Sequence, residues 1–201
     1  NSISMVDDKV ENAQYIRRTG AGVRVLLGTR SAYAYTAGTD EASLIATAKA
    51  AAAALRGAPE GRQIVFAASG FRAPMAVPFT AVENDRRMAL LREATRAARS
   101  VSPEVVQVQA NYTDKVRRTL VCNSEGTFAE AERPYTRAGV AVVARQGAEA
   151  QTGFEGPGCC RGFEAYSTQI DLGESAMAAA RCAVTMLLSL IHISEPTRLG
   201  M

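Results

Sequence analysis

The 201-residue sequence contains no tryptophan and a single histidine, His192, which lies close to its C-terminal end. A hydrolytic zinc site needs imidazoles or equivalent ligands, and it needs a carboxylate that takes a proton from the metal-bound water. The residues before His192 supply no imidazole. We therefore expect no metal ligand and no catalytic residue of a zinc hydrolase in this chain.

Cysteine is also scarce, and its spacing matches no known type of site. The four cysteines form no CxxC or CxxxC pair, which argues against both a structural zinc site and a disulfide framework. Unpaired thiols favour a reducing compartment. The four residues are Cys122, Cys159, Cys160 and Cys182.

The charge pattern and the apolar runs exclude two classes of partner. The net charge is only +3, and arginines and acids are mixed along the chain, whereas a nucleic-acid surface would gather its cations on one face. The apolar run at 176–193 contains Arg181, and an arginine at a bilayer centre costs roughly 2.5–3.5 kcal/mol. The first residues do not resemble a secretory signal. We expect neither a nucleic-acid partner nor a membrane partner.

Hydrophobic periodicity predicts an α+β fold, with antiparallel β-sheets and two to three packing helices. Alternation with a period of two indicates strands in several segments, and a period near 3.6 indicates helices in three others. The predicted strands lie within residues 2–36, 63–67, 104–131 and 139–155, and the predicted helices at 40–56, 84–99 and 173–187.

These elements suggest four segments along the chain. Residues 1–68 form an N-terminal β-meander with a helix, and 69–83, which contain two prolines and no clear period, form a loop or linker. Residues 84–187 hold a helix, an antiparallel sheet with a glycine-rich loop, and a C-terminal helix. Residues 188–201 form a C-terminal tail.

The helix patterns also predict which side chains face the core. In the first helix the expected apolar stripe is Leu44, Ile45, Ala48, Ala52 and Leu55, and in the second it is Met88, Leu91, Thr95 and Ala98, with Arg86, Arg87, Arg92 and Arg96 outward. The third helix should pack through Ala176, Ala179, Ala180, Ala183 and Leu187. For the strand pair Tyr33 and Tyr35, core or sheet-face packing is favoured over a stacking platform for a ligand.

A glycine-rich loop follows the strands around Gly147. It reads QTGFEGPGCCRGFE and contains Gly153, Gly156, Gly158 and Gly162. Glycine belongs where the chain bends sharply or where another backbone approaches closely. A phosphate-binding loop is excluded, because no lysine is present and no helix opens directly after the glycines. Cys159 and Cys160 beside Arg161 could form a nucleophile, but the chain offers no histidine base.

This loop, together with GAGVRVLLGTRSAYAYT at Gly20 to Thr36, resembles the TldD/PmbA family and in particular its TldD branch. The resemblance covers nearly all residues from Ser2 to Leu187. Cys159 and Cys160 depart from the usual form of the loop, which is closer to EGPGGRRG.

The resemblance implies a function for the whole protein more than for this chain. Members are zinc metallopeptidases that hydrolyse peptides or unfolded segments and work as two related subunits in a cytoplasmic complex. Their zinc motif, HExxxH on a helix, has no counterpart here, so this chain would be an N-terminal fragment that is inactive alone. A wall of the substrate channel is the expected role of Gly153, Glu155, Gly156, Gly158, Arg161 and Gly162; the alternative is a loop that only bends the chain.

Two other functions stay open. The parent protein could be the non-catalytic PmbA/TldE-like partner subunit, which serves assembly and binding, or the chain could be a stand-alone β-rich binding module.

The C-terminal residues 188–198 read LSLIHISEPTR, which resembles a translated sequencing adapter. We therefore predict that 188–201 are not native, and we give His192 no chemical role.

Overall fold

The computed structural model describes residues 1–55 and 63–194, which form two compact units. One unit comprises residues 1–15 and those from Ala67 onward, and the other comprises residues 16–66. The α+β class with antiparallel sheets and packing helices is confirmed. No helix in the described ranges is long and apolar enough to cross a membrane.

The smaller unit is a β-hairpin with one helix. Strands β3 (Ala21–Leu27) and β4 (Arg30–Thr36) pair antiparallel, and helix α1 (Glu41–Ala53) packs on them. The predicted cap is confirmed, because the Asp40 carboxylate accepts a hydrogen bond of 2.9 Å from the backbone N–H of Ser43.

One prediction for this unit is wrong. Ile45 and Ala52 are exposed, and the buried positions of α1 are Thr47 and Ala51, because the helix packs on only two strands and turns a narrow stripe toward them. Tyr33 and Tyr35 are 66% and 81% exposed, so of the two packing modes expected for them, core and sheet face, the structure has the second. Their rings stack on each other with centroids 6.4 Å apart, and Tyr33 lies over Gly22 of β3.

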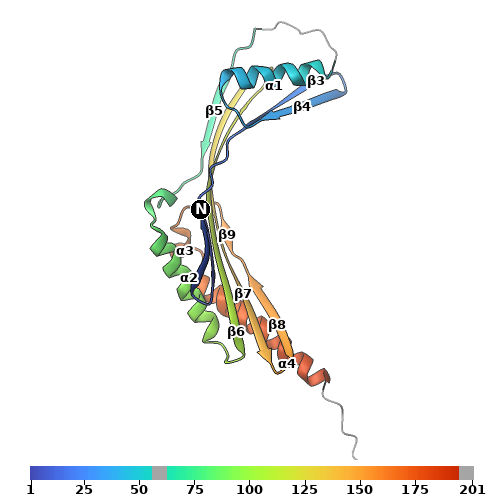
Figure 1. The fold of residues 1–201 in the computed structure, drawn as a ribbon. Helices are drawn as coiled ribbons and strands as arrows, with labels where there is room; N and C mark the ends of the chain where they lie inside the picture. Colours follow the sequence, from blue (N-terminus) through green and yellow to red (C-terminus); the bar gives the residue numbers. More distant parts are fainter. Residues whose placement is uncertain (56–62, 195–201) are drawn as a thin grey trace, which may run out of the picture. The chain divides into compact units, whose positions relative to one another are not determined.

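The larger unit is built on one seven-stranded sheet (Figure 1). Its strand order is β2-β1-β6-β7-β5, and β8 and β9 also pair with β7. Each pair is antiparallel except β5 with β7. The strands are β1 (Ser2–Val6), β2 (Lys9–Gln14), β5 (Ala67–Arg72), β6 (Val105–Cys122), β7 (Thr127–Gln146), β8 (Glu149–Glu155) and β9 (Gly158–Cys159).

Two long helices, α2 (Asn84–Arg99) and α4 (Leu172–Ser194), pack against each other and against this sheet. Short helical turns, η1 (Phe79–Ala81) and α3 (Ala165–Thr168), precede them. The predicted face of the third helix is confirmed, because Ala176, Ala179, Ala180, Ala183 and Leu187 are all fully buried. They meet alternate residues of the central strands, including Val108, Val140 and Val142.

Several element boundaries differ from the prediction. The strand expected at 63–67 lies at Ala67–Arg72 and so extends into the segment 69–83 expected to be a loop, because it forms a parallel ladder with β7. The strands expected within 104–131 and the strand expected from residue 139 form two continuous strands of 18 and 20 residues, β6 and β7. Helix α4 continues past Leu187 to Ser194, since no glycine or proline stops it before Pro196. The origin of residues 188–201 stays a prediction, and 195–201 lie outside the described residues.

Arg87 is buried, which contradicts the outward position predicted from the sequence. Only 3% of it is exposed. Position 87 lies one turn before Leu91 and so shares the buried stripe of α2. Its burial introduces a charged centre beneath the glycine-rich loop.

Candidate functional site

The glycine-rich loop begins where β8 leaves the sheet. Gly153 lies within β8 opposite Val142 and faces helix α4. A Cβ atom at this position would lie 2.0 Å from the carbonyl oxygen of Ala179 and 2.9 Å from the backbone nitrogen of Ala183. Gly153 therefore allows the backbone of α4 to touch the backbone of the sheet.

The next two glycines make close contacts within the chain as well. A Cβ on Gly156 would lie 2.7 Å from the Phe154 ring and 2.8 Å from the Arg137 guanidinium, and Arg137 Nε donates a hydrogen bond of 3.2 Å to the Gly156 carbonyl. A Cβ on Gly158 would lie 2.9 Å from the Thr136 carbonyl oxygen. These contacts explain the glycines through the packing of the loop on β7.

The charged residues of the loop behave differently. Glu155 and Arg161 are both exposed, and neither side chain has a hydrogen bond or an ion pair with any residue in ranges 1–55 and 63–194. They border the stretch in which the chain passes from β8 through β9 to α3. A charge at either position is free to meet a ligand.

The loop ends in a carboxylate clamp formed by Glu164. Its Oε2 accepts a hydrogen bond of 2.8 Å from the Val77 N–H, and its Oε1 accepts bonds of 3.2 and 3.0 Å from the N–H groups of Ala76 and Gly162. A Cβ on Gly162 would lie 2.4 Å from the Val77 carbonyl oxygen. The clamp thus attaches the loop to the segment before η1, although the two are more than 80 residues apart.

Partial burial acts to raise the pKa of Glu164, but the hydrogen bonds from Val77, Ala76 and Gly162 outweigh it, and the pKa lies below its ordinary value of 4.5. The folded state therefore favours the carboxylate. The stability that it contributes is fully present above pH 4.5, the value expected in the unfolded chain, and is lost as the pH falls through the lower folded pKa.

We predict that Glu164→Gln lowers the free energy of unfolding at pH 7 by about 1–2 kcal/mol, the scale of hydrogen bonds to a partly exposed charge. The difference from wild type should shrink as the pH falls below 4.5. Urea unfolding at a series of pH values measures it. Glu125→Gln is the matched control, because Glu125 is exposed in the turn before β7. A deficit that stayed constant with pH would contradict the clamp.

Aromatic rings fill the space beneath the loop. Phe163 and Tyr166 pack against Tyr112 of β6, with centroid distances of 6.0 and 5.8 Å. The Tyr166 hydroxyl forms a hydrogen bond of 2.9 Å with Thr136 Oγ1. Burial raises the pKa of Tyr166 to about 12, and it raises the pKa of Tyr112 well above its ordinary value. Both phenols are therefore neutral at physiological pH and act as packing groups.

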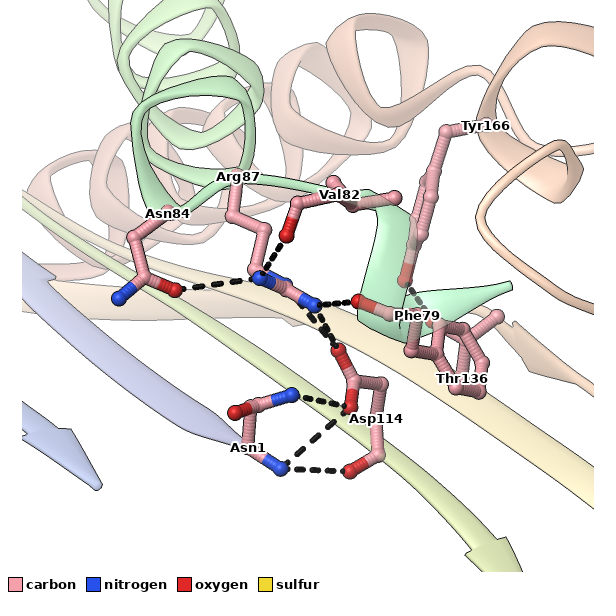
Figure 2. Close-up of polar contacts among 8 residues, drawn as sticks. All are labelled: Asn1, Phe79, Val82, Asn84, Arg87, Asp114, Thr136 and Tyr166. Carbon is pink, nitrogen blue, oxygen red and sulfur yellow. Dashed lines mark hydrogen bonds and ion pairs between the residues drawn. The ribbon is translucent and has the colours of Figure 1, made fainter. Parts of the chain in front are cut away.

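Arg87 of α2 and Asp114 of β6 form a buried ion pair (Figure 2). Arg87 Nε and Nη2 lie 3.1 and 3.0 Å from Asp114 Oδ2, and both side chains are 3% exposed. Asp114 Oδ1 accepts a hydrogen bond of 2.8 Å from the Asn1 side chain. The carboxylate is thus compensated on both oxygens, as burial of a charge requires.

The remaining guanidinium donors hold the entry to helix α2. Arg87 Nη1 donates to the Val82 carbonyl at 2.6 Å and to the Asn84 side chain at 3.1 Å, and Nη2 donates to the Phe79 carbonyl at 2.6 Å. One side chain therefore joins β6, η1 and α2 (Figure 2). Because the Glu164 clamp holds the loop on the segment just before η1, the pair fixes the support on which the loop rests.

Sequence reasoning missed Arg87, Asp114 and Glu164, and only one of them carries a visible signal. Asp114 continues the inward series Val108, Ala110, Tyr112 at a spacing of two. An acid at a buried position of a strand requires a cation. Neither Arg87 nor Glu164 stands out in this way.

The cysteines of the loop do not form an activated nucleophile. Burial is the main cause that raises the pKa of the Cys159 thiol above its ordinary value, which disfavours the thiolate. The next residue, Cys160, is exposed to solvent. The interpretation of this pair as a nucleophile has no support from the geometry.

The side chains in the described ranges do not form a zinc site. Within residues 1–55 and 63–189, no group of three or more His, Cys, Asp or Glu side chains converges. The donor set present there does not fit a hydrolytic zinc ion. We assign no step of a metal-dependent reaction to these residues.

Two models of protein-family domains match the chain and together cover most of it. Residues 1–55 match the PmbA/TldA metallopeptidase domain 1, and residues 77–187 match the PmbA/TldA metallopeptidase central domain. A curated relative, the metalloprotease TldD homolog of Haemophilus influenzae, is 25% identical over 186 residues, which are 90% of this chain and 38% of the relative.

Solved structures share the fold. A protein of Thermotoga maritima described as a modulator of a DNA gyrase has a TM-score of 0.69 at 15% identity, over 92% of this chain and 42% of that protein. TldE from Thermococcus kodakarensis has a TM-score of 0.60 at 15% identity, over 90% of this chain and 41% of that one. The chain thus spans about two fifths of the length of these relatives. From the two domain matches, the chain belongs to the PmbA/TldD metallopeptidase family.

Proposed function

We propose that this chain is the N-terminal part of a TldD-like zinc metallopeptidase that hydrolyses peptides or unfolded segments. The observation that carries the proposal is the identity of 25% with a metalloprotease TldD homolog over 90% of the chain. Because the chain spans only 38% of that relative, we assign the HExxxH motif and its zinc to the part of the protein that has no counterpart here. The chain alone is then inactive.

Within that protein, this part serves as scaffold, as contact to a related TldD/PmbA-type subunit, and as a wall of the substrate channel. The unpaired charges of Glu155 and Arg161 support the channel role, whereas the packing of Gly153, Gly156, Gly158 and Gly162 supports a loop that holds these charges in place. We place the protein in the cytoplasm, because its four cysteines are free thiols.

In the complete enzyme with its partner subunit, we predict that Glu155→Ala and Arg161→Ala each lower kcat/KM for peptide hydrolysis about tenfold. A hydrogen bond to a charged group contributes roughly 1.5–3 kcal/mol when its partner is otherwise unpaired. The measurement is turnover of a fluorogenic peptide, with KM and kcat determined separately.

Glu149→Ala and Arg145→Ala are the matched controls for this experiment. Both residues are exposed near the β7–β8 turn, at the other end of β8 from the loop. They should leave turnover within about twofold of wild type, as surface changes usually do. Unchanged turnover in the two loop variants would exclude the channel role.

A second candidate is a non-catalytic PmbA/TldE-like partner subunit with the same fold. The structural similarity to TldE from Thermococcus kodakarensis, with a TM-score of 0.60, supports this second candidate. The uninterrupted gene decides between the two: an HExxxH motif after this part supports the peptidase, and its absence supports the partner. A stand-alone binding module, in contrast, predicts that the chain is a stable monomer in solution.

A further inference from the structure

The outer part of the β6–β7 hairpin has two chemically different faces. Strand residues alternate between them, and the register pairs Lys115 with Tyr135, Arg117 with Arg133 and Thr119 with Ala131. Phe71 of β5 pairs with Ala131 and shares their face. We call this side the cationic face and define it by Lys115, Arg117, Arg133, Tyr135 and Phe71. The cationic face has no acidic residue at its strand positions in β5 or in this part of β6 and β7.

The other side of the same strands carries its own counter-charge. Glu132 Oε1 lies 3.7 Å from Arg72 Nε, and Glu132 Oε2 lies 2.7 Å from Arg118 Nε. The two arginines are 77% and 80% exposed, whereas Glu132 is only 16% exposed, so the carboxylate sits between them. On this side, an arginine of β5 and an arginine of β6 share the carboxylate of Glu132 on β7, the strand between them.

The cationic face also carries two arginines close together, but no carboxylate of the described strands lies between them. Arg117 and Arg133 occupy directly opposite positions of an antiparallel pair, where like charges destabilise the sheet. Arg117 makes no hydrogen bond or ion pair with any described residue, and Arg133 lies only over the Phe71 ring, 5.3 Å from its centroid. The sheet therefore holds two unneutralised guanidinium groups side by side.

A hollow marks this position on the surface. It has a volume of about 250 Å³ and is lined by Arg117, Thr119, Ala131, Arg133 and Tyr135. Ala131 and Thr119 form a second opposite pair with small side chains, which leaves space between the arginines and the next positions of the strands. The space is bordered by guanidinium donors suited to a carboxylate.

We propose that the cationic face binds an acidic segment of an extended polypeptide, with a carboxylate of that segment between Arg117 and Arg133. The ligand carboxylate takes the part that Glu132 plays on the opposite side. Binding at this face does not require peptide hydrolysis by the complete enzyme.

The aromatic residues favour a peptide over a single-stranded nucleic acid. Bases bind to proteins by stacking on aromatic faces. Here Lys115 lies 5.2 Å over the Tyr135 ring and Arg133 lies 5.3 Å over the Phe71 ring, so a cation covers a face of each ring. The rings hold the cations in position and leave them to attract an anion.

The test is a fluorescence anisotropy titration of the 201-residue chain with a labelled peptide that alternates Asp and Glu with small residues. The control peptide has Asn and Gln in place of the acids. We expect the acidic peptide to bind, and we expect its affinity to fall as salt is added. Replacing both arginines, Arg117→Gln with Arg133→Gln, should weaken binding about tenfold, because each exposed charge contributes modestly.

Arg118→Gln is the matched control, since Arg118 is the next residue and points to the side of Glu132. It should change the affinity by less than about twofold. Replacing Arg117 or Arg133 relieves a like-charge contact, so the melting temperatures should not fall. The single variants Arg117→Gln and Arg133→Gln should each weaken binding as well, which tests the assignment independently of the double variant. Equal binding of the neutral peptide, no effect of the double variant, or tighter binding of an oligothymidylate through the same arginines would overturn the proposal.

Discussion

Replacing Arg87 by alanine is expected to lower the free energy of unfolding by about 3–5 kcal/mol, the cost of removing one partner from a buried ion pair. Both Arg87 and Asp114 are 3% exposed, so bulk solvent does not hydrate the carboxylate when the guanidinium is removed. The Asp114 carboxylate would keep the Asn1 side chain on Oδ1 but lose its donors on Oδ2. A carboxylate left this way is costly to bury.

The loss extends beyond the ion pair, because Arg87 also satisfies two backbone carbonyls. Those of Phe79 and Val82 accept its hydrogen bonds at 2.6 Å each. Without them the segment between η1 and α2 loses its attachment to β6. We expect this segment to become the first part of the larger unit to exchange its amide hydrogens.

Urea unfolding of the variant measures the change, and Arg92→Ala is the matched control. Arg92 lies on the same helix but is exposed and has no partner among the described side chains, so its replacement should cost less than about 0.5 kcal/mol. The double variant with Asp114→Ala should be less destabilised than the sum of the two single changes, because neither charge is then left alone. Equal costs for Arg87→Ala and Arg92→Ala would show that the pair contributes no stability.

Local patterns were sufficient where one element determines its own structure. The limits of α2, the Asp40 cap and the buried face of α4 follow from periodicity and capping within a few turns. The turn at Gly147 with its positive φ of 60° is also local. Such features need no knowledge of the residues that lie across the core.

Other features depend on partners that are distant in the sequence. Strand β5 has an irregular sequence, AASGFR, and forms because β7 offers it a parallel ladder from Thr127 to Glu132. Arg87 reads as one of several helix arginines until Asp114 is seen beside it. In both cases the deciding interaction joins segments that no window of residues contains together.

The glycine-rich loop shows the same limit. Its glycines indicated a close approach, but the sequence could not say what approaches. In the structure Gly153 meets α4, Gly156 meets Phe154 and Arg137, and Gly162 meets Val77. The space that could be assigned to a substrate from the sequence is, at these positions, occupied by the chain itself.

Adding a single methyl group at Gly153 is therefore expected to be one of the most damaging small changes in the chain. A Cβ there would lie 2.0 Å from the Ala179 carbonyl oxygen and 2.9 Å from the Ala183 nitrogen. Both atoms belong to the backbone of α4 and cannot rotate away as a side chain can. The helix must move off β8, which opens the contact that buries Ala176, Ala179, Ala180, Ala183 and Leu187.

We predict that Gly153→Ala lowers the free energy of unfolding by about 3 kcal/mol or more, at the upper end of overpacking, since backbone and not side chain must yield. Gly70→Ala is the matched control, because Gly70 lies in exposed strand β5 and its nearest contact would be 4.0 Å away. The same substitution there should be neutral or slightly stabilising, as alanine restricts the unfolded chain. Urea unfolding of the two variants compares them directly. If both glycines tolerated alanine equally, α4 could not be packed on β8 through a direct backbone contact, and the role assigned to Gly153 would have to be given up.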